Sequence, residues 1–156
     1  MIEARALLAT ASKLLESEPS EVDVRRSVST AYYALFHHVC WHFSDIILQP
    51  QSGAYERARL QAYRYLDHGV AKVRCNEATA QAKGFPAGIV EFAEAFIDLQ
   101  QLRHAADYDP KQRFVEADAR TLIVSAEAAL MAFDAEPVEA RRAFVVFLGL
   151  RPRGGR

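Results

Sequence analysis

Apolar side chains recur every three or four residues through almost the whole chain, and this helical spacing constrains the fold more than any other feature. In the longest stretch, for example, Val24, Val28 and Ala31 fall on one face of a helix. Glycine and proline stand mostly at the edges of such stretches, and no stretch shows the strict alternation typical of a strand. The sequence therefore predicts an all-α fold, an antiparallel bundle of four to five main helices with a short C-terminal helix.

Breaks in this spacing divide the chain into expected elements. Ser20 followed by Asp23 resembles a capping box at the start of the longest helix. We expect a single domain over residues 1–150 and a basic, disordered tail over residues 151–156. The expected helices run from Ile2 to Leu15, from Val24 to Ile46, from about Ala54 to Cys75 with a weaker continuation to Lys83, from Pro86 to about Ala106, from Val115 to Phe133, and after Glu136-Pro137 through Phe144 to Leu148.

Composition and charge exclude several classes of protein. The chain has 19 basic and 20 acidic side chains, which give a formal net charge of -1. Its overall charge therefore does not attract nucleic acid, and nucleic-acid binding would need a local patch of basic side chains. The longest apolar run, residues 143–150, is too short for a membrane span. The first residues form an amphipathic pattern without an apolar signal region, and Cys40 and Cys75 lack metal-ligand spacing. We therefore expect a cytoplasmic protein with no membrane association.

The five histidines do not form a recognisable metal motif. A di-iron bundle needs Glu-x-x-His, yet no histidine here follows a carboxylate by three residues. His38 and His42 are four residues apart and could share a ligand, but Cys40 between them points to the opposite side of the helix. From the sequence we predict no metal site and no cofactor.

Two segments carry polar groups that ordinary packing does not explain. Arg103 continues the apolar stripe of Phe92, Phe96 and Leu99, and burying a guanidinium needs a partner such as Asp107, one turn on. An ion pair that merely ends the helix is the alternative to a functional role. The other segment, residues 25–38, places Tyr33 and His37 on one helical face that Ser29 and Arg26 continue.

These segments resemble motifs of the HEPN superfamily, helical-bundle proteins that include a small stand-alone prokaryotic branch. Residues 29–37 read Ser-Thr-Ala-Tyr-Tyr-Ala-Leu-Phe-His, and residues 103–108 read Arg-His-Ala-Ala-Asp-Tyr. Between them, residues 68–70 read His-Gly-Val, similar to a turn of the same branch. The resemblance implies a homodimer whose arginine motifs meet at a cleft. It also implies RNA or nucleotide association and possible pairing with a nucleotidyltransferase in a toxin–antitoxin system.

The resemblance also assigns roles to residues. Arg103 would bind phosphate, Asp107 would orient it, and Tyr108 would hydrogen-bond at the cleft or be nucleotidylated by a partner. His68 completes the candidate catalytic set, and the remaining candidate binding residues are Arg26, Tyr33, His37 and His104. The family's nuclease motif has a histidine five to seven positions after the arginine, where this chain has Tyr108, Asp109 and Pro110.

Because of that departure, three functions stay open. The first is a noncatalytic RNA- or nucleotide-associated component of a toxin–antitoxin or nucleotidyltransferase-paired system. The second is a metal-independent endoribonuclease in which His68 or His104 replaces the missing base. The third is a noncatalytic helical bundle that binds other proteins.

Overall fold

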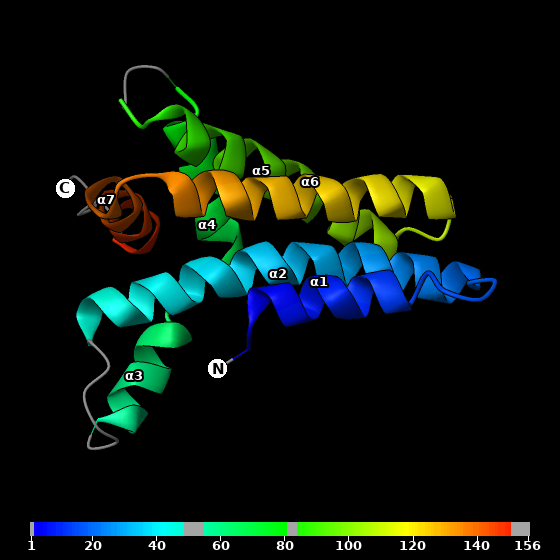
Figure 1. The fold of residues 1–156 in the computed structure, drawn as a ribbon, viewed down its shortest axis with the longest axis horizontal. Helices are drawn as coiled ribbons and strands as arrows, with labels where there is room; N and C mark the ends of the chain where they lie inside the picture. The colour runs from blue at the N-terminus through cyan, green and yellow to red at the C-terminus, as the bar shows by residue number, and fades with distance from the viewer. Residues whose placement is uncertain (1, 49–54, 81–83, 151–156) are drawn as a thin grey trace.

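The computed structural model describes residues 2–48, 55–80 and 84–150, and within these ranges it contains seven helices and no strand (Figure 1). The prediction of an all-α bundle is therefore confirmed. The helices are α1 (Ala4–Lys13), α2 (Glu21–Ile47), α3 (Glu56–Tyr63), α4 (His68–Ala78), α5 (Ala87–Tyr108), α6 (Glu116–Ala135) and α7 (Val138–Gly149).

The long helix α2 is the centre of the bundle. It packs against α1, α3, α5, α6 and α7, and Figure 1 shows α1 and α6 lying along it while α3 projects from its C-terminal end. Its first turn is fixed by the predicted capping box, in which the Ser20 hydroxyl accepts from the Asp23 N–H (3.2 Å) and the Asp23 carboxylate accepts from the Ser20 N–H (2.9 Å). This cap therefore sets where α2 begins.

Aromatic rings from three helices meet in the core. Phe92 of α5, Phe133 of α6 and Phe144 of α7 are fully buried, with ring centroids 5.0 to 6.2 Å apart. Such contacts stabilise a core beyond the area they bury. The apolar C-terminal segment, whose burial the sequence left open, packs in this core through Phe144, Val145 and Leu148.

The helix predicted from about Ala54 to Cys75 is wrong, because the structure has two helices there. α3 ends at Tyr63 and α4 begins at His68. The carboxylate of Asp67 accepts the N–H groups of Gly69 (2.9 Å) and Val70 (3.0 Å), so it caps a new helix instead of continuing the old one. The helical spacing of apolar residues continues across this break, which is why periodicity alone missed it.

Some expectations concern residues outside the described ranges. These are the stop signal at Pro50 and Gly53, the predicted helix start at Ala54, the continuation to Lys83 and the basic tail at 151–156. Among the described residues, no helix combines the length and the apolar character needed to cross a membrane.

Candidate functional site

A polar hollow of about 470 Å³ lies where the first half of α2 passes the C-terminal end of α5. Five of the predicted site residues meet here, contributed by both helices. The lining consists of Val22, Arg25, Arg26, Tyr33, Arg103, Ala106, Asp107 and Tyr108. The geometry thus brings together two segments that are far apart in the sequence.

Arg103 is held in this hollow by two partners. Its Nε lies 2.7 Å from Oδ2 of Asp107, and its Nη2 donates to the Tyr33 hydroxyl at 2.9 Å. The guanidinium carbon also lies 5.4 Å from the Tyr33 ring centroid and 5.8 Å from that of Tyr108, within cation–π range. Burial alone would lower the pKa of Arg103, but Tyr33 and Asp107 outweigh it and the net shift is upward. The side chain is therefore a fixed cation, about one fifth exposed.

Asp107 uses both of its carboxylate oxygens within the protein. Oδ2 pairs with Arg103, and Oδ1 accepts a 2.6 Å hydrogen bond from the hydroxyl of Ser29 on α2. Ser29 is buried, so this bond ties the end of α5 to the middle of α2. Asp107 is arranged to orient Arg103 rather than to exchange protons with a substrate.

Arg25 has a structural role that the sequence analysis did not assign. Its guanidinium donates to the carbonyls of Ala106 (3.0 Å), Asp109 (3.0 Å) and Gln112 (2.5 Å), and it pairs with Glu21 one turn earlier (3.1 Å). Carbonyls at a helix C-terminus lack partners within the helix, so a cation there stabilises the end of α5. The i,i+4 spacing from Glu21 was visible in the sequence, but the carbonyl contacts were not.

His37 and His68 lie next to Tyr33 but do not line the hollow. The ring centroid of each is 6.0 Å from that of Tyr33. The Nδ1 of His37 hydrogen-bonds the Tyr63 hydroxyl at 2.5 Å, and that of His68 hydrogen-bonds the Tyr32 hydroxyl at 2.7 Å. Burial lowers the pKa of both histidines, and the charge of Arg103 lowers that of His68 further. Both imidazoles are therefore neutral at neutral pH.

Three other predicted residues lie at the edge of the hollow. Tyr108 is exposed and lines the hollow. The ring of His104 packs against that of Tyr108 with centroids 5.1 Å apart, but His104 itself is not part of the lining. Arg26 is exposed and lines the hollow from α2.

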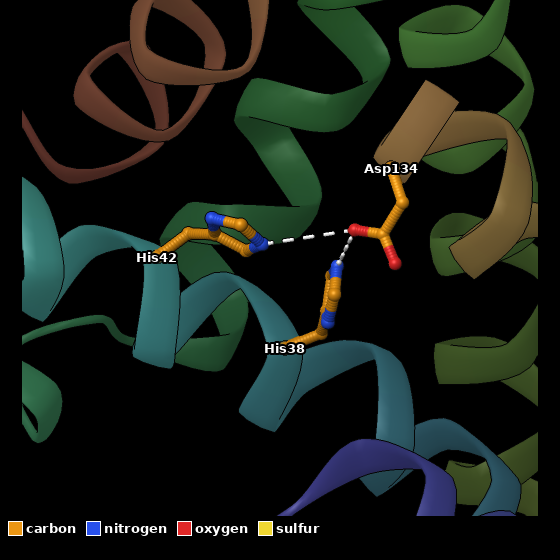
Figure 2. Close-up of side chains that lie close together, drawn as sticks. All are labelled: His38, His42 and Asp134. Atoms are coloured by element: carbon orange, nitrogen blue, oxygen red, sulfur yellow. Dashed lines mark hydrogen bonds and ion pairs between the residues drawn. The ribbon is translucent and has the colours of Figure 1, made fainter. Parts of the chain in front are cut away.

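A second polar cluster lies at the junction of α2 and α6. Figure 2 shows His38 and His42 on α2 pointing toward one carboxylate oxygen of Asp134 on α6. The Nε2 atoms lie 3.0 Å (His38) and 3.8 Å (His42) from that oxygen. These three side chains form the one group among the described residues whose donor atoms could share a metal ion. The third donor could not be found from the spacing of the histidines, because Asp134 is 96 positions from His38.

Comparison of the chain with protein-family models, with curated proteins and with solved structures gave no match.

Proposed function

We propose that this chain is an HEPN-type RNA- or nucleotide-associated protein that binds a phosphate group at Arg103. One observation carries the proposal: the guanidinium is held by Tyr33 and Asp107 at the wall of an open hollow rather than folded onto an outer surface. A component of a toxin–antitoxin or nucleotidyltransferase-paired system is the biological setting that the motif resemblance suggests.

The chemistry of the hollow suits a phosphodiester. Arg103 donates an Nη2 proton to Tyr33 and forms an ion pair with Asp107 through Nε. A guanidinium has five N–H donors, so the other Nη donors can serve an oxyanion. Arg26 on α2 adds a second cation to the lining of the hollow, and its side chain is exposed. The rings of Tyr33 and Tyr108 offer surfaces on which a base can stack beside the bound phosphate.

The rim of the hollow also suits a second protein chain. Val22 and Tyr108 both line it, and they are 64% and 66% exposed. Tyrosine is enriched in protein–protein interfaces, and a partner chain would bury both side chains. The homodimer suggested by the motif resemblance would place two copies of Arg103 near each other across this rim, and an exposed Tyr108 would be accessible to a modifying partner.

The test is a titration of a fluorescently labelled RNA hairpin with the protein, followed by anisotropy. We expect Arg103→Ala to weaken binding more than tenfold, or about 1.4 kcal/mol. The control is Arg120→Ala, which removes an i,i+4 pair with the same 2.7 Å Nε–carboxylate distance, to Glu116, on the exposed face of α6. If Arg103→Ala binds the RNA with the same affinity as wild type, Arg103 is not part of the site. A noncatalytic helical bundle that binds other proteins would then be the remaining function.

A cleavage assay in EDTA separates binding from catalysis. If the chain is a metal-independent ribonuclease that uses His68, wild type cleaves the hairpin, and both Arg103→Ala and His68→Ala lose that cleavage. The noncatalytic function that we favour predicts intact RNA with all three proteins and a binding defect in Arg103→Ala alone. His68 lies next to Tyr33 but does not line the hollow, which favours the noncatalytic function.

A further inference from the structure

We propose that His38, His42 and Asp134 bind a divalent transition-metal ion of the zinc class. Two imidazole nitrogens and one carboxylate oxygen are donors that this class of ion prefers, and three protein ligands leave a coordination position open. The site is independent of the Arg103 hollow and does not rest on the function proposed above.

The donor atoms are close to the separation that a metal requires. Zinc–ligand bonds of about 2.0–2.1 Å at the tetrahedral angle place neighbouring donors about 3.3 Å apart. In the structure the His38 Nε2 and the His42 Nε2 lie 3.0 and 3.8 Å from Oδ1 of Asp134, and all three donors lie within 4.8 Å of one another. The 3.0 and 3.8 Å distances lie on either side of the value of about 3.3 Å that tetrahedral coordination requires.

The scaffold around the donors holds them in place. His38 and His42 are one helical turn apart on α2, with ring centroids 4.6 Å apart, and both rings pack on the buried ring of Phe133 at 5.0–5.1 Å. Phe133 immediately precedes Asp134 on α6, so one local packing arrangement positions all three ligands. The ring of Trp41 packs edge-on against that of His42, with centroids 5.0 Å apart. Ligands fixed in this way need little reorganisation to bind a metal.

Metal binding also depends on the protonation state of each ligand. Burial is the main influence on His38 and lowers its pKa, so the imidazole is neutral at neutral pH. Burial opposes ionisation of Asp134, but the hydrogen bonds from His38 and His42 outweigh it and lower its pKa well below the usual range. A carboxylate and neutral imidazoles are the forms that ligate, once each ring proton moves to Nδ1.

The site is open on one side. The His38 and His42 side chains are 14% and 16% exposed, whereas that of Asp134 is 35% exposed. His38 also lines a hollow of about 390 Å³, together with Glu3, Arg5 and Trp41, among others.

Arg5 is the nearest competitor for the carboxylate. Its Nη2 lies 3.4 Å from Oδ2 of Asp134, the oxygen that faces away from the histidines. The Arg5 side chain is 56% exposed and can turn into solvent, so it does not block the ligand set. Its charge opposes a cation, and therefore Arg5→Ala should bind metal at least as tightly as wild type.

The test uses the whole chain without a histidine tag, stripped with EDTA and dialysed. Calorimetric titration with Zn²⁺ and visible absorption with Co²⁺ should show one ion per chain, and the ion should raise the melting temperature. We expect His42→Ala and Asp134→Asn to weaken Zn²⁺ binding at least tenfold. The control His104→Ala removes an exposed histidine on α5 and should bind like wild type.

The outcomes decide the proposal in either direction. Circular dichroism of each variant shows whether it is folded. If His42→Ala is unfolded, Asp134→Asn still tests the site, because asparagine has nearly the same size as aspartate. The site is supported if wild type binds one Zn²⁺ ion per chain saturably, if His42→Ala and Asp134→Asn lose this binding, and if His104→Ala and Arg5→Ala keep it. Absence of binding by wild type, or equal binding by Asp134→Asn, would show that the three residues form a hydrogen-bonded cluster only.

Discussion

The close approach of α5 to α6 at Gly88 predicts that a single methyl group destabilises the protein. A Cβ on Gly88 would lie 2.5 Å from the backbone oxygen of Ala132 and 2.6 Å from Oε1 of Glu136. That is about 0.8 Å short of an ordinary C···O contact of about 3.3 Å. The Gly88 N–H also donates to Glu136 at 2.7 Å, so the methyl group would displace the carboxylate that caps α5. The backbone of Ala132 cannot turn away as a side chain could.

The expected magnitude follows from three effects. Forced overpacking costs about 1–3 kcal/mol, and loss of a capping carboxylate costs about 1 kcal/mol. Alanine stabilises a helix by about 0.5–1 kcal/mol relative to glycine, which offsets part of this loss. We therefore expect Gly88→Ala to lose about 2 kcal/mol of unfolding free energy, or about 4–8 °C in melting temperature.

Gly69→Ala is the matched control for this experiment. Gly69 is also the second residue of its helix, and its N–H also donates to a carboxylate, that of Asp67. A Cβ there meets only the Asp67 Oδ1, at 3.3 Å. Urea denaturation of both variants isolates the contact with α6, because the backbone position and the substitution are the same. If Gly88→Ala proved as stable as Gly69→Ala, the packing of α5 against α6 described here would be wrong.

Two further predictions concern α7 and pH. In Gly149→Ala the new Cβ would clash with the buried ring of Phe43, so we expect a lower melting temperature that Phe43→Leu partly restores. Additive effects of the two changes would contradict this contact. Burial lowers the pKa of His37, His38 and His68, so the unfolded chain binds more protons than the folded chain below about pH 6.5, the usual histidine pKa. The contribution of these histidines to the free energy of unfolding is therefore complete above about pH 6.5 and decreases as pH falls. A urea midpoint that does not change between about pH 7.5 and about pH 5.5 would refute this prediction.

Sequence reasoning succeeded where the geometry lies within one helix. Residues four apart share a face, so the Arg103–Asp107 pair and the stacking of Tyr33 on His37 were predictable, and both occur. The capping box at Ser20 was predictable for the same reason, because its partners are three residues apart. The local chemistry of these pairs does not depend on where neighbouring helices lie.

Contacts between helices could not be derived in this way. The Ser29–Asp107 hydrogen bond joins residues 78 positions apart, and the His38–Asp134 bond joins residues 96 apart. Their formation depends on how α2 packs against α5 and α6, which periodicity does not specify. The break before α4 is different, because Asp67 carried a usable local signal: aspartate is a preferred N-cap residue and is compatible with a new helix start.

The two candidate sites occupy different faces of α2, and this separation makes each a control for the other. Tyr33 and His38 are five residues apart, which turns their side chains about 140° from each other around the helix. One side chain joins the two regions: His37 stacks on Tyr33 at 6.0 Å and lines the same hollow as His38. An aromatic pair contributes about 0.5–1.5 kcal/mol. This value limits the free energy by which binding at one site can affect binding at the other through His37. A variant that loses RNA binding but keeps metal binding, or the reverse, therefore reports a local defect in a bundle that is still folded.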